Sequence, residues 1–405
     1  MNKMKYLLII VIAVFASCNS NHKKQDGLDK LSWNEIEQQA KGKSVTMLMY
    51  VGSKGLNRYI NEYVVPTLKQ RYSITMNVVN GQGKDIVSNI MSEKEAGKEV
   101  GQADLCWING ETFYQLRQVD GLYGPYTDKL PNFKFVDYDN PIIKYDFQEE
   151  VKGYETPWSL ASFYLMYDSI RVKQPPVSMQ DFENYWKANP GKFTIPNDFS
   201  GYTLLKSWLI ELAGGAGALD GKFDQDKYDR YSSQLWAWLN KNKQYFWKKG
   251  ETFPATNTAV SQMFGNGELD FGLSFSVSEI DLKVNEGVLP ATTKPLILKA
   301  GSIQNANYIG ITYNSAEKAA AMVVCNFLIS PEAQAKKADL SFSGARSVLA
   351  YNKLSKEDKA MFDELTTIKF GLQPADIEGR TIKEPAPTYM IKMTEDFRKY
   401  VIEAK

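Results

Sequence analysis

One uncharged stretch in the interior of the chain limits the folds open to it. Leu160–Tyr167 is an apolar and aromatic run of strand length, and such a run is typical of a strand that is buried on both faces. Pro157 comes shortly before the run and Pro175-Pro176 shortly after it, and proline interrupts regular backbone pairing. We therefore expect a buried strand that crosses between two lobes, with the rest of the chain arranged around this crossing.

The length and composition fit a two-lobed protein and exclude several kinds of function. The chain has 405 residues, which exceeds one ordinary core and predicts two domains. The net charge is +1, so the composition gives no support to a nucleic-acid partner. The single histidine, His22, lies in a polar segment near the N-terminus. This position excludes histidine-based nucleophilic catalysis and histidine-based zinc sites.

The N-terminus carries a predicted export signal. Two lysines form a positive n-region, and Leu7–Ala16 is an apolar run that is too short to span a bilayer. Residues 1–17 are therefore predicted to be a signal peptide. The small residues before Cys18 resemble the bacterial lipobox, in which this cysteine is lipidated, although Phe15 stands where leucine is usual.

These features predict where the mature protein resides. We expect it to be exported and lipid-anchored to a bacterial membrane through Cys18, in the periplasm or at the cell surface. Residues 18–32 are predicted to be a flexible tether. An ordinary secreted protein without a lipid is the alternative. Cys106 and Cys325 lie in apolar sequence surroundings, which favours two buried thiols over a disulfide.

The first part of the chain alternates strands and helices. Ser44–Val51 is a predicted strand, Asn57–Arg71 a helix and Ile74–Val79 the next strand, and this order predicts a parallel sheet. Gly52 and Ser53 form the turn after the first strand, where free backbone N–H groups at a helix N-terminus suit a polar or anionic ligand group. A simple connection between strand and helix is the alternative interpretation.

A third short strand, Ala103–Ile108, leads to a second group of candidate ligand contacts. Trp107, Asn109 and Glu111 come at the carboxyl end of this strand, where open α/β sheets place their ligands. Glu111 is equally consistent with a charge in the first turn of a helix, where the helix dipole favours a carboxylate.

The part after the buried stretch repeats the strand–loop–helix order. Phe193–Ile195 is a predicted strand, followed by a loop and by a helix over Tyr202–Ala213. Asp198, Ser200 and Tyr202 are candidate ligand contacts at this helix start. For Asp198 and Ser200 the alternative role is capping, because such side chains satisfy the free N–H groups of a helix.

Another strand and helix start supply further candidates. Leu269–Phe275 alternates as a strand and leads into S-x-x-E at Ser276–Glu279, which predicts a capping box. Because the serine and the glutamate of that motif then have structural roles, the candidate ligand contacts are Ser274, Phe275 and Ser278.

A late strand is predicted to return the chain across the junction. This second crossing is Ala306–Thr312, and Asn307 and Tyr308 within it are candidate ligand contacts. The C-terminal part, through Tyr389–Ala404, is predicted to be mainly helical and to close back on the first lobe. The expected division is a first lobe from residues 33–158 and 306–405, and a second lobe from residues 159–305.

Several segments together resemble one known protein family. They are E-K-E-A-G-K at Glu93–Lys98, D-L-C-W-I-N-G-E-T-F at Asp104–Phe113, L-P-N-F at Leu130–Phe133, G-Y-E-T-P-W at Gly153–Trp158, N-P-G-K-F-T-I-P-N-D-F-S-G at Asn189–Gly201 and I-S-P-E-A-Q at Ile329–Gln334. With them the chain resembles the extracellular solute-binding proteins of ABC importers, and most closely their uncharacterised YnjB-like branch. That branch has a Trp-Gly-Gly-like turn after the first strand. Here Tyr50-Val51-Gly52-Ser53 takes that place, so ligand preference is expected to differ.

The resemblance implies a fold and a function. The fold is α/β, a type II periplasmic-binding-protein fold with two α/β lobes joined by two crossing hinge strands. The function is that of a substrate-binding lipoprotein, which captures a small solute between the lobes and delivers it to an ABC permease driven by its ATPase. We expect a monomer without catalytic activity, cofactor or metal. The expected ligand contacts are Gly52, Ser53, Trp107, Asn109, Glu111, Trp158, Asp198, Ser200, Tyr202, Ser274, Phe275, Ser278, Asn307 and Tyr308.

Two questions stay open at this point. Trp158 is either a platform on which a ligand stacks or a core residue buried against the crossing strand. Aromatic residues beside Glu111 and Asp198 favour an organic cation, thiamine-like or polyamine-like. Helix N-termini facing the cleft favour an anion instead.

Two other classes of function compete with solute binding. A surface hydrolase would use paired carboxylates, for which the candidates are Asp104, Glu111, Asp198 and Glu279. A receptor or adhesin domain would bind no small ligand at all.

Overall fold

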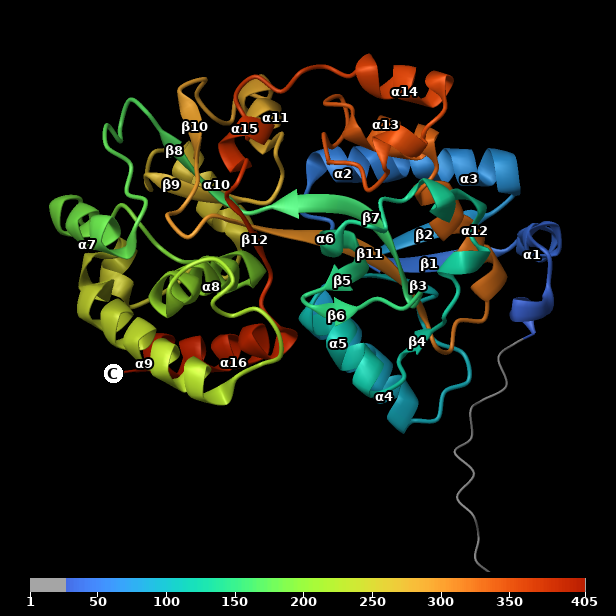
Figure 1. The fold of residues 1–405 in the computed structure, drawn as a ribbon, viewed down its shortest axis with the longest axis horizontal. Helices are drawn as coiled ribbons and strands as arrows, with labels where there is room; N and C mark the ends of the chain where they lie inside the picture. Colours follow the sequence, from blue (N-terminus) through green and yellow to red (C-terminus); the bar gives the residue numbers. More distant parts are fainter. Residues whose placement is uncertain (1–26, 405) are drawn as a thin grey trace, which may run out of the picture.

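The computed structural model describes residues 27–404, and its elements form two halves side by side (Figure 1). The large-sheet half is built on a seven-stranded mixed sheet, and the small-sheet half on a three-stranded sheet. A hairpin of β5 (Tyr145–Asp146) and β6 (Glu149–Glu150) belongs to neither sheet. The predicted signal peptide and the lipid-attachment residue Cys18 lie outside the described residues.

The large sheet contains the strands β1 (Ser44–Met49), β2 (Thr75–Asn80), β3 (Leu105–Ile108), β4 (Leu122–Tyr123), β7 (Glu155–Ser162), β11 (Ser302–Thr312) and β12 (Thr381–Lys383). Their order is β12-β11-β3-β1-β2, and β4 and β7 also pair with β11. β1 runs parallel to β2 and β3, as the strand–helix–strand order predicted. The carboxyl ends of these three strands therefore share one edge of the sheet.

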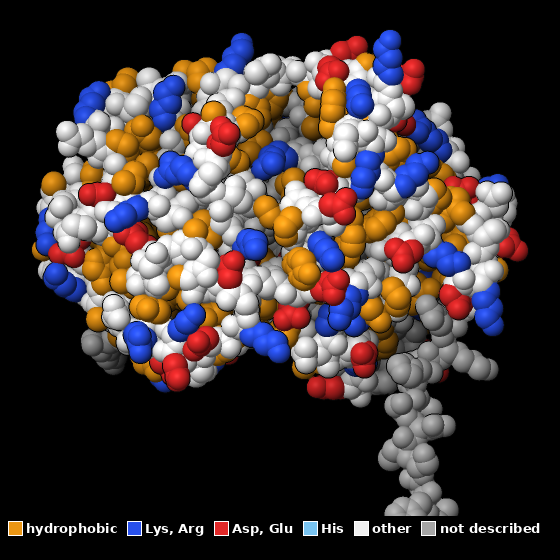
Figure 2. Space-filling view, viewed as in Figure 1, with side chains coloured by type: hydrophobic (Ala, Val, Ile, Leu, Met, Phe, Trp, Pro, Cys, Tyr) orange, Lys and Arg blue, Asp and Glu red, His pale blue; other side chains and the backbone are white. Residues whose placement is uncertain are grey.

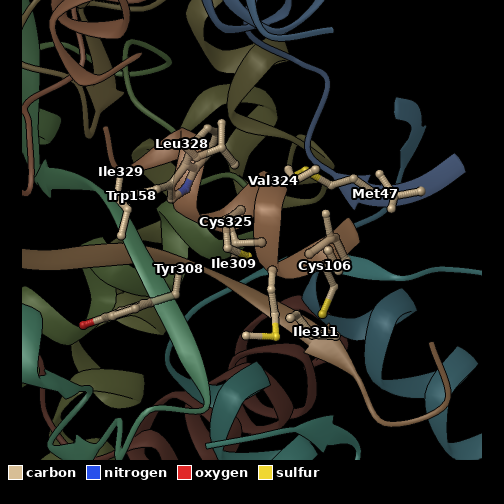
Figure 3. Close-up of a cluster of buried hydrophobic side chains, with 14 of the residues drawn as sticks. Met47, Cys106, Trp158, Tyr308, Ile309, Ile311, Val324, Cys325, Leu328 and Ile329 are labelled. Atoms are coloured by element: carbon tan, nitrogen blue, oxygen red, sulfur yellow. The ribbon is translucent and has the colours of Figure 1, made fainter. Parts of the chain in front are cut away.

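The helices of this half are α1 (Trp33–Ala40), α2 (Lys54–Arg58), α3 (Val65–Tyr72), α4 (Gly83–Glu95), α5 (Glu111–Gln118), α6 (Pro141–Lys144), α12 (Lys318–Leu328), α13 (Pro331–Ala338) and α14 (Lys356–Asp363). Figure 1 shows α2, α3 and α13 on one side of the sheet and α4 and α5 on the other. The core between them contains Cys106 and Cys325 (Figure 3). Both are buried free thiols, as predicted.

The small-sheet half contains β8 (Tyr164–Asp168), β9 (Phe271–Ser274), β10 (Thr293–Leu296), α7 (Met179–Ala188), α8 (Phe199–Ala213), α9 (Gln225–Asn242), α10 (Asn257–Gly265), α11 (Glu279–Asn285), α15 (Pro374–Ile377) and α16 (Pro387–Phe397). Its core is rich in aromatic rings, among them Phe182, Trp186 and Trp208. The prediction of a strand at Phe193–Ile195 was wrong. These residues are buried in the aromatic core, and the backbone oxygen of Phe193 accepts from the Trp247 N–H (2.8 Å), so the segment is bonded to Trp247 instead of a strand.

Two long strands join the halves. β7 and β11 are antiparallel partners from Gln304–Ser162 to Gly310–Glu155. The predicted strand over Leu160–Tyr167 is interrupted at Phe163, where the chain leaves the large sheet and continues as β8 in the small one. At that point the backbone N–H of Phe163 donates to Ile303 (2.8 Å) and that of Ser162 to Phe275 (3.0 Å).

The C-terminal part makes a third connection. After α14 the chain passes to α15 and β12, and α16 then packs on α8 and α9 of the small-sheet half. This differs from the expectation that residues 306–405 all return to the first lobe. One face of α16 explains this difference. It carries apolar side chains at i, i+4 spacing, which join the aromatic core: Tyr389, Met393 and Phe397.

The first described residues lie against the large-sheet half. Leu28 is buried, and the Lys129 ammonium donates to the backbone oxygen of Leu31 (3.3 Å). The end of the predicted tether therefore packs on the folded part. Among residues 27–404, no helix is long and apolar enough to cross a membrane.

Candidate functional site

The turn after β1 reaches the small-sheet half. Ser53 caps α2, since its Oγ accepts from the backbone N–H of Leu56 (3.4 Å). The Tyr50 side chain lies over Gly52, where an added Cβ would collide with the phenol ring. The Tyr50 hydroxyl is 3.4 Å from the Thr258 hydroxyl at the start of α10. Side chains of the two halves therefore meet at this point.

Trp107, near the end of β3, connects this turn to the crossing strands. Its indole N–H donates to Asn307 Oδ1 (3.2 Å), and the Asn307 amide donates to Ser159 Oγ (3.1 Å). The ring lies edge-on to Tyr50, with centroids 6.4 Å apart. Trp107 and Asn307 are both half-buried. The structure thus brings together two of the predicted contacts and adds Tyr50 to them.

The residues after β3 lie against the β5–β6 hairpin. The backbone N–H of Gly110 donates to Asp146 Oδ2 (2.5 Å), and a Cβ on Gly110 would meet the Phe147 ring at 2.5 Å. Glu111 Oε2 is buried without a hydrogen-bond partner. Burial raises the pKa of Glu111 to about 7, against a usual 4.5. Asn109 is half-buried at the same edge.

The start of α8 uses its polar residues for capping. Asp198 Oδ1 accepts from the N–H groups of Ser200 (3.0 Å) and Gly201 (3.3 Å), and Oδ2 accepts from that of Asn257 (2.5 Å). Burial still raises the pKa of this carboxyl. Both oxygens of Asp198 thus have structural partners, as the capping alternative stated.

Phe275 follows β9 and faces the junction, whereas its serine neighbours are internally bonded. Its ring lies 5.3 Å from that of Phe199 and 5.2 Å from that of Phe163. Ser274 and Ser278 are buried, and Ser278 Oγ donates to the backbone oxygen of Ser343 (3.2 Å).

The predicted capping box at Ser276–Glu279 was wrong. α11 begins at Glu279 with Ser278 as its N-cap residue, and no side chain caps it. The Glu279 carboxylate bonds to Ser274 and Lys283 instead. The Ser274 hydroxyl and the Lys283 ammonium are thus the partners of Glu279, in place of the backbone N–H group that a capping box would supply.

Three other predicted contacts are packed or hydrogen-bonded inside the protein, although the ring of Trp158 lies 5.2 Å from that of Trp107. Trp158 is 1% exposed and packs in the core with Leu328 and Ile329, while Tyr308 points to the opposite side (Figure 3). Tyr308 donates to the backbone oxygen of Ile143 (2.9 Å). Tyr202 donates to Asn197 (2.8 Å) and its ring contacts α16. Trp158 is therefore a core residue in this structure, not a stacking platform.

Sequence reasoning missed Phe147 and Thr258. Phe147 and Gln148 form the hairpin tip, both with positive φ. The Gln148 amide donates to the Glu384 backbone oxygen (2.7 Å), and its Oε1 accepts from the Gly221 N–H (2.5 Å). No glycine marks this turn in the sequence, so the usual hairpin signal is absent.

Two cavities lie near the junction. The larger, of about 320 Å³, is lined by the hairpin, α6, β11 and the end of β12. The smaller, of about 180 Å³, lies at the ends of β1 and β2. In Figure 2 acidic and basic side chains are interspersed over the visible face, so this face carries no large patch of one charge.

The carboxylates proposed for a hydrolase do not form a pair. Asp104 accepts from the Thr46 N–H (2.9 Å) and from Ser315 Oγ (2.6 Å). Asp198 and Glu279 are also committed to structural bonds, as described above. Among residues 27–404, no group of three His, Cys, Asp or Glu side chains could hold a metal ion.

Residues 63–363 match the family of bacterial extracellular solute-binding proteins. The chain belongs to this family. It is also 34% identical over 326 residues to the protein YnjB of Escherichia coli strain K12, covering 80% of this chain and 84% of that protein. The resemblance drawn from the sequence segments is confirmed.

Solved structures share the fold. One is AfuA of Actinobacillus pleuropneumoniae, a periplasmic binding protein with fructose-6-phosphate bound (TM-score 0.63, 12% identity, 89% of this chain and 99% of that one). Another is iron-bound HitA of Pseudomonas aeruginosa (TM-score 0.58, 15% identity, 87% and 98%). The predicted type II periplasmic-binding-protein fold is confirmed. Family and fold are those of solute-binding proteins of ABC import systems, not of enzymes.

Proposed function

We propose that this protein captures a small solute between its two halves and delivers it to an ABC permease, whose ATPase drives import. In this proposal the chain is exported, lipid-anchored through Cys18 and monomeric. The halves act as two lobes that close on the solute by bending at the crossing strands. The first lobe contains residues 33–158 and 306–363, the second contains residues 159–305 with α15 and α16, and β12 between these two helices pairs with β11 of the large sheet.

One contact carries the proposal. Tyr50 and Thr258 belong to different halves, yet their hydroxyls lie 3.4 Å apart, at the carboxyl end of β1 and the start of α10. Trp107 beside them is hydrogen-bonded to the crossing strand β11. A solute held between Tyr50, Trp107 and the start of α10 would therefore touch both halves and the strands that join them.

The binding region is expected to have aromatic walls and helix starts. Tyr50 and Trp107 form one side, and Phe199 and Phe275 form the other. These rings would stack on an organic part of the solute, and any cationic group on it would make cation–π contacts. Asp198 would contribute little to cation binding, because three backbone N–H groups already occupy its carboxylate.

Thermal shift and small-angle scattering would test the proposal together. A solute at 100 times its dissociation constant adds about 2.7 kcal/mol of stability, and closure would reduce the radius of gyration. Trp107→Ala should abolish the response, whereas Tyr351→Ala, an exposed aromatic residue elsewhere, should retain it. A solute that stabilises both variants equally and leaves the radius unchanged would refute binding between the halves.

A further inference from the structure

Two cations beside the crossing strand β7, the buried Lys337 and the half-buried Arg346, have no acidic partner. Arg346 and Lys337 form no ion pair within residues 27–404, and burial alone lowers the pKa of each. The other buried lysine, Lys206, is instead paired with Glu384. Among the buried lysines of residues 27–404, Lys337 therefore differs from Lys206 in having no carboxylate partner.

Arg346 is fixed at the line where the two halves meet. Its backbone oxygen accepts from the Leu160 N–H (3.2 Å), and its guanidinium donates to Ser162 Oγ (3.2 Å). The backbone N–H of Ser162 in turn donates to the oxygen of Phe275 in the small-sheet half (3.0 Å). The Arg346 guanidinium is thus hydrogen-bonded to the last residue of β7, where the chain leaves the large sheet.

Two serine hydroxyl groups lie near the segment that carries Arg346. Gly344, two residues before Arg346, lies so close to Ser278 that a Cβ would collide with the Ser278 side chain. Ser276 Oγ is 3.1 Å from Ser278 Oγ, and Ser276 is partly exposed. Hydroxyl groups and guanidinium groups are the donors that proteins use for carboxylates and phosphates.

Lys337 is hydrogen-bonded to the segment that precedes Arg346. Its ammonium donates to Gln334 Oε1 (3.1 Å) and lies 5.4 Å from the centre of the Trp158 ring. Its backbone oxygen accepts from Ser343 Oγ (2.7 Å) and from the Ala345 N–H (3.4 Å). The segment that carries Arg346 is therefore attached to the end of α13 beside a second positive charge.

A desolvated cation without a counter-charge is costly, and an arginine does not release its proton to relieve that cost. A bound anion would supply the missing charge. We propose that Arg346, positioned by the buried Ser162 hydroxyl, and the hydroxyl of Ser276 bind an oxyanion group of the solute, a carboxylate, phosphate or sulfate. This inference rests on the proposed function, because it assigns the chemical class of the solute held between the halves.

Calorimetric titration with defined probes tests the inference. The anionic probes are inorganic phosphate, sulfate and citrate, which distinguish the three oxyanion types, and the cationic probes are spermidine and thiamine. We expect at least one anion to bind and neither cation to do so. Arg346→Gln should weaken that binding by about tenfold or more, since one charge-assisted hydrogen bond has this magnitude. Arg346→Lys should restore part of it by returning the charge.

The control is Arg398→Gln, because Arg398 is an exposed arginine far along the chain that pairs with Glu403. It should bind the anion as the natural chain does. Binding of no anionic probe, or equal binding by Arg346→Gln, overturns the inference. If spermidine or thiamine binds and Trp107→Ala abolishes that binding, the oxyanion site is refuted while capture between the halves stands. If Arg346→Gln weakens anion binding but Trp107→Ala does not, the anion site stands and the proposed location of the solute fails.

Discussion

The ring of Phe147 lies 6.3 Å from the ring of Phe199. The first residue is at the tip of the β5–β6 hairpin and the second begins α8, so the hairpin bridges the two halves. The Lys206 ammonium lies 4.4 Å from the centre of the Phe147 ring. This bridge places an apolar contact and a cation–π contact beside the candidate ligand residues Asn109 and Glu111, which follow β3.

Phe147→Ala should lower the free energy of unfolding by about 3 kcal/mol, because it removes a buried ring between Gly110 and Phe199. Denaturation in urea measures the loss. Tyr145→Ala is the matched control in the same hairpin, since Tyr145 is 40% exposed, and it should cost much less. Equal losses for the two variants would contradict the bridging role of Phe147.

Glu384→Gln should destabilise the protein by about 3 kcal/mol or more, because it leaves the Lys206 ammonium buried without its carboxylate. Guanidinium denaturation provides the measurement. The double change of Lys206→Met with Glu384→Leu should recover most of the loss, since it removes both buried charges. A double variant as unstable as Glu384→Gln would show that side-chain packing, not the unpaired charge, causes the loss.

Glu111 should make stability depend on pH. Its pKa in the folded protein is about 7, raised by burial from a usual 4.5. A raised pKa means that the folded state holds the proton more tightly, so this contribution is fully present below pH 4.5. It is lost as the pH rises through 7.

Glu111→Gln should remove that dependence, because glutamine stays neutral at every pH. Relative to the natural chain, the variant should gain about 1 to 3 kcal/mol at pH 8 and little at pH 4. Urea denaturation at both pH values measures the difference. A gain of the same size at pH 4 would mean that the effect is not one of ionisation.

Asp281→Ala should loosen the segment that crosses from α14 to α15. The Asp281 carboxylate accepts from the backbone N–H groups of Lys369 (2.7 Å), Phe370 (3.1 Å) and Gly371 (2.7 Å). Without it, hydrogen exchange at these amides should accelerate, and stability should fall by about 2 kcal/mol. Asp281→Asn keeps one acceptor oxygen and should show a smaller effect. Unchanged exchange at all three amides in Asp281→Ala would contradict this role.

Local patterns predicted most elements of the large-sheet half. Ser32 caps the helix Trp33–Ala40, and Ser330 caps α13 with Pro331 in its first turn. Such signals are short-range, since each depends on residues within one turn of the helix. The parallel pairing of β1 with β2 also follows from the order of elements alone.

The candidate site was only partly predictable, because a residue type does not state its tertiary neighbours. Trp107 and Trp158 are both tryptophans in strands of the large sheet, yet the first is half-buried at the junction and the second is buried in the core beside α12 and α13. Phe147 gave no signal, since nothing local shows that a hairpin tip will touch the start of a distant helix.

The sequence by itself determined the alternation of strands and helices, the caps and the family, because these depend on local residue order and spacing. The tertiary structure decided which side chains reach the junction and which halves the late segments join. Tyr389, Met393 and Phe397 would fit any apolar surface, and only the aromatic core beside α8 and α9 shows where they pack. The role proposed for Arg346 likewise depends on the absence of a neighbouring carboxylate within the described residues. The tertiary structure, and not the order of residues, decides which charges lie close together.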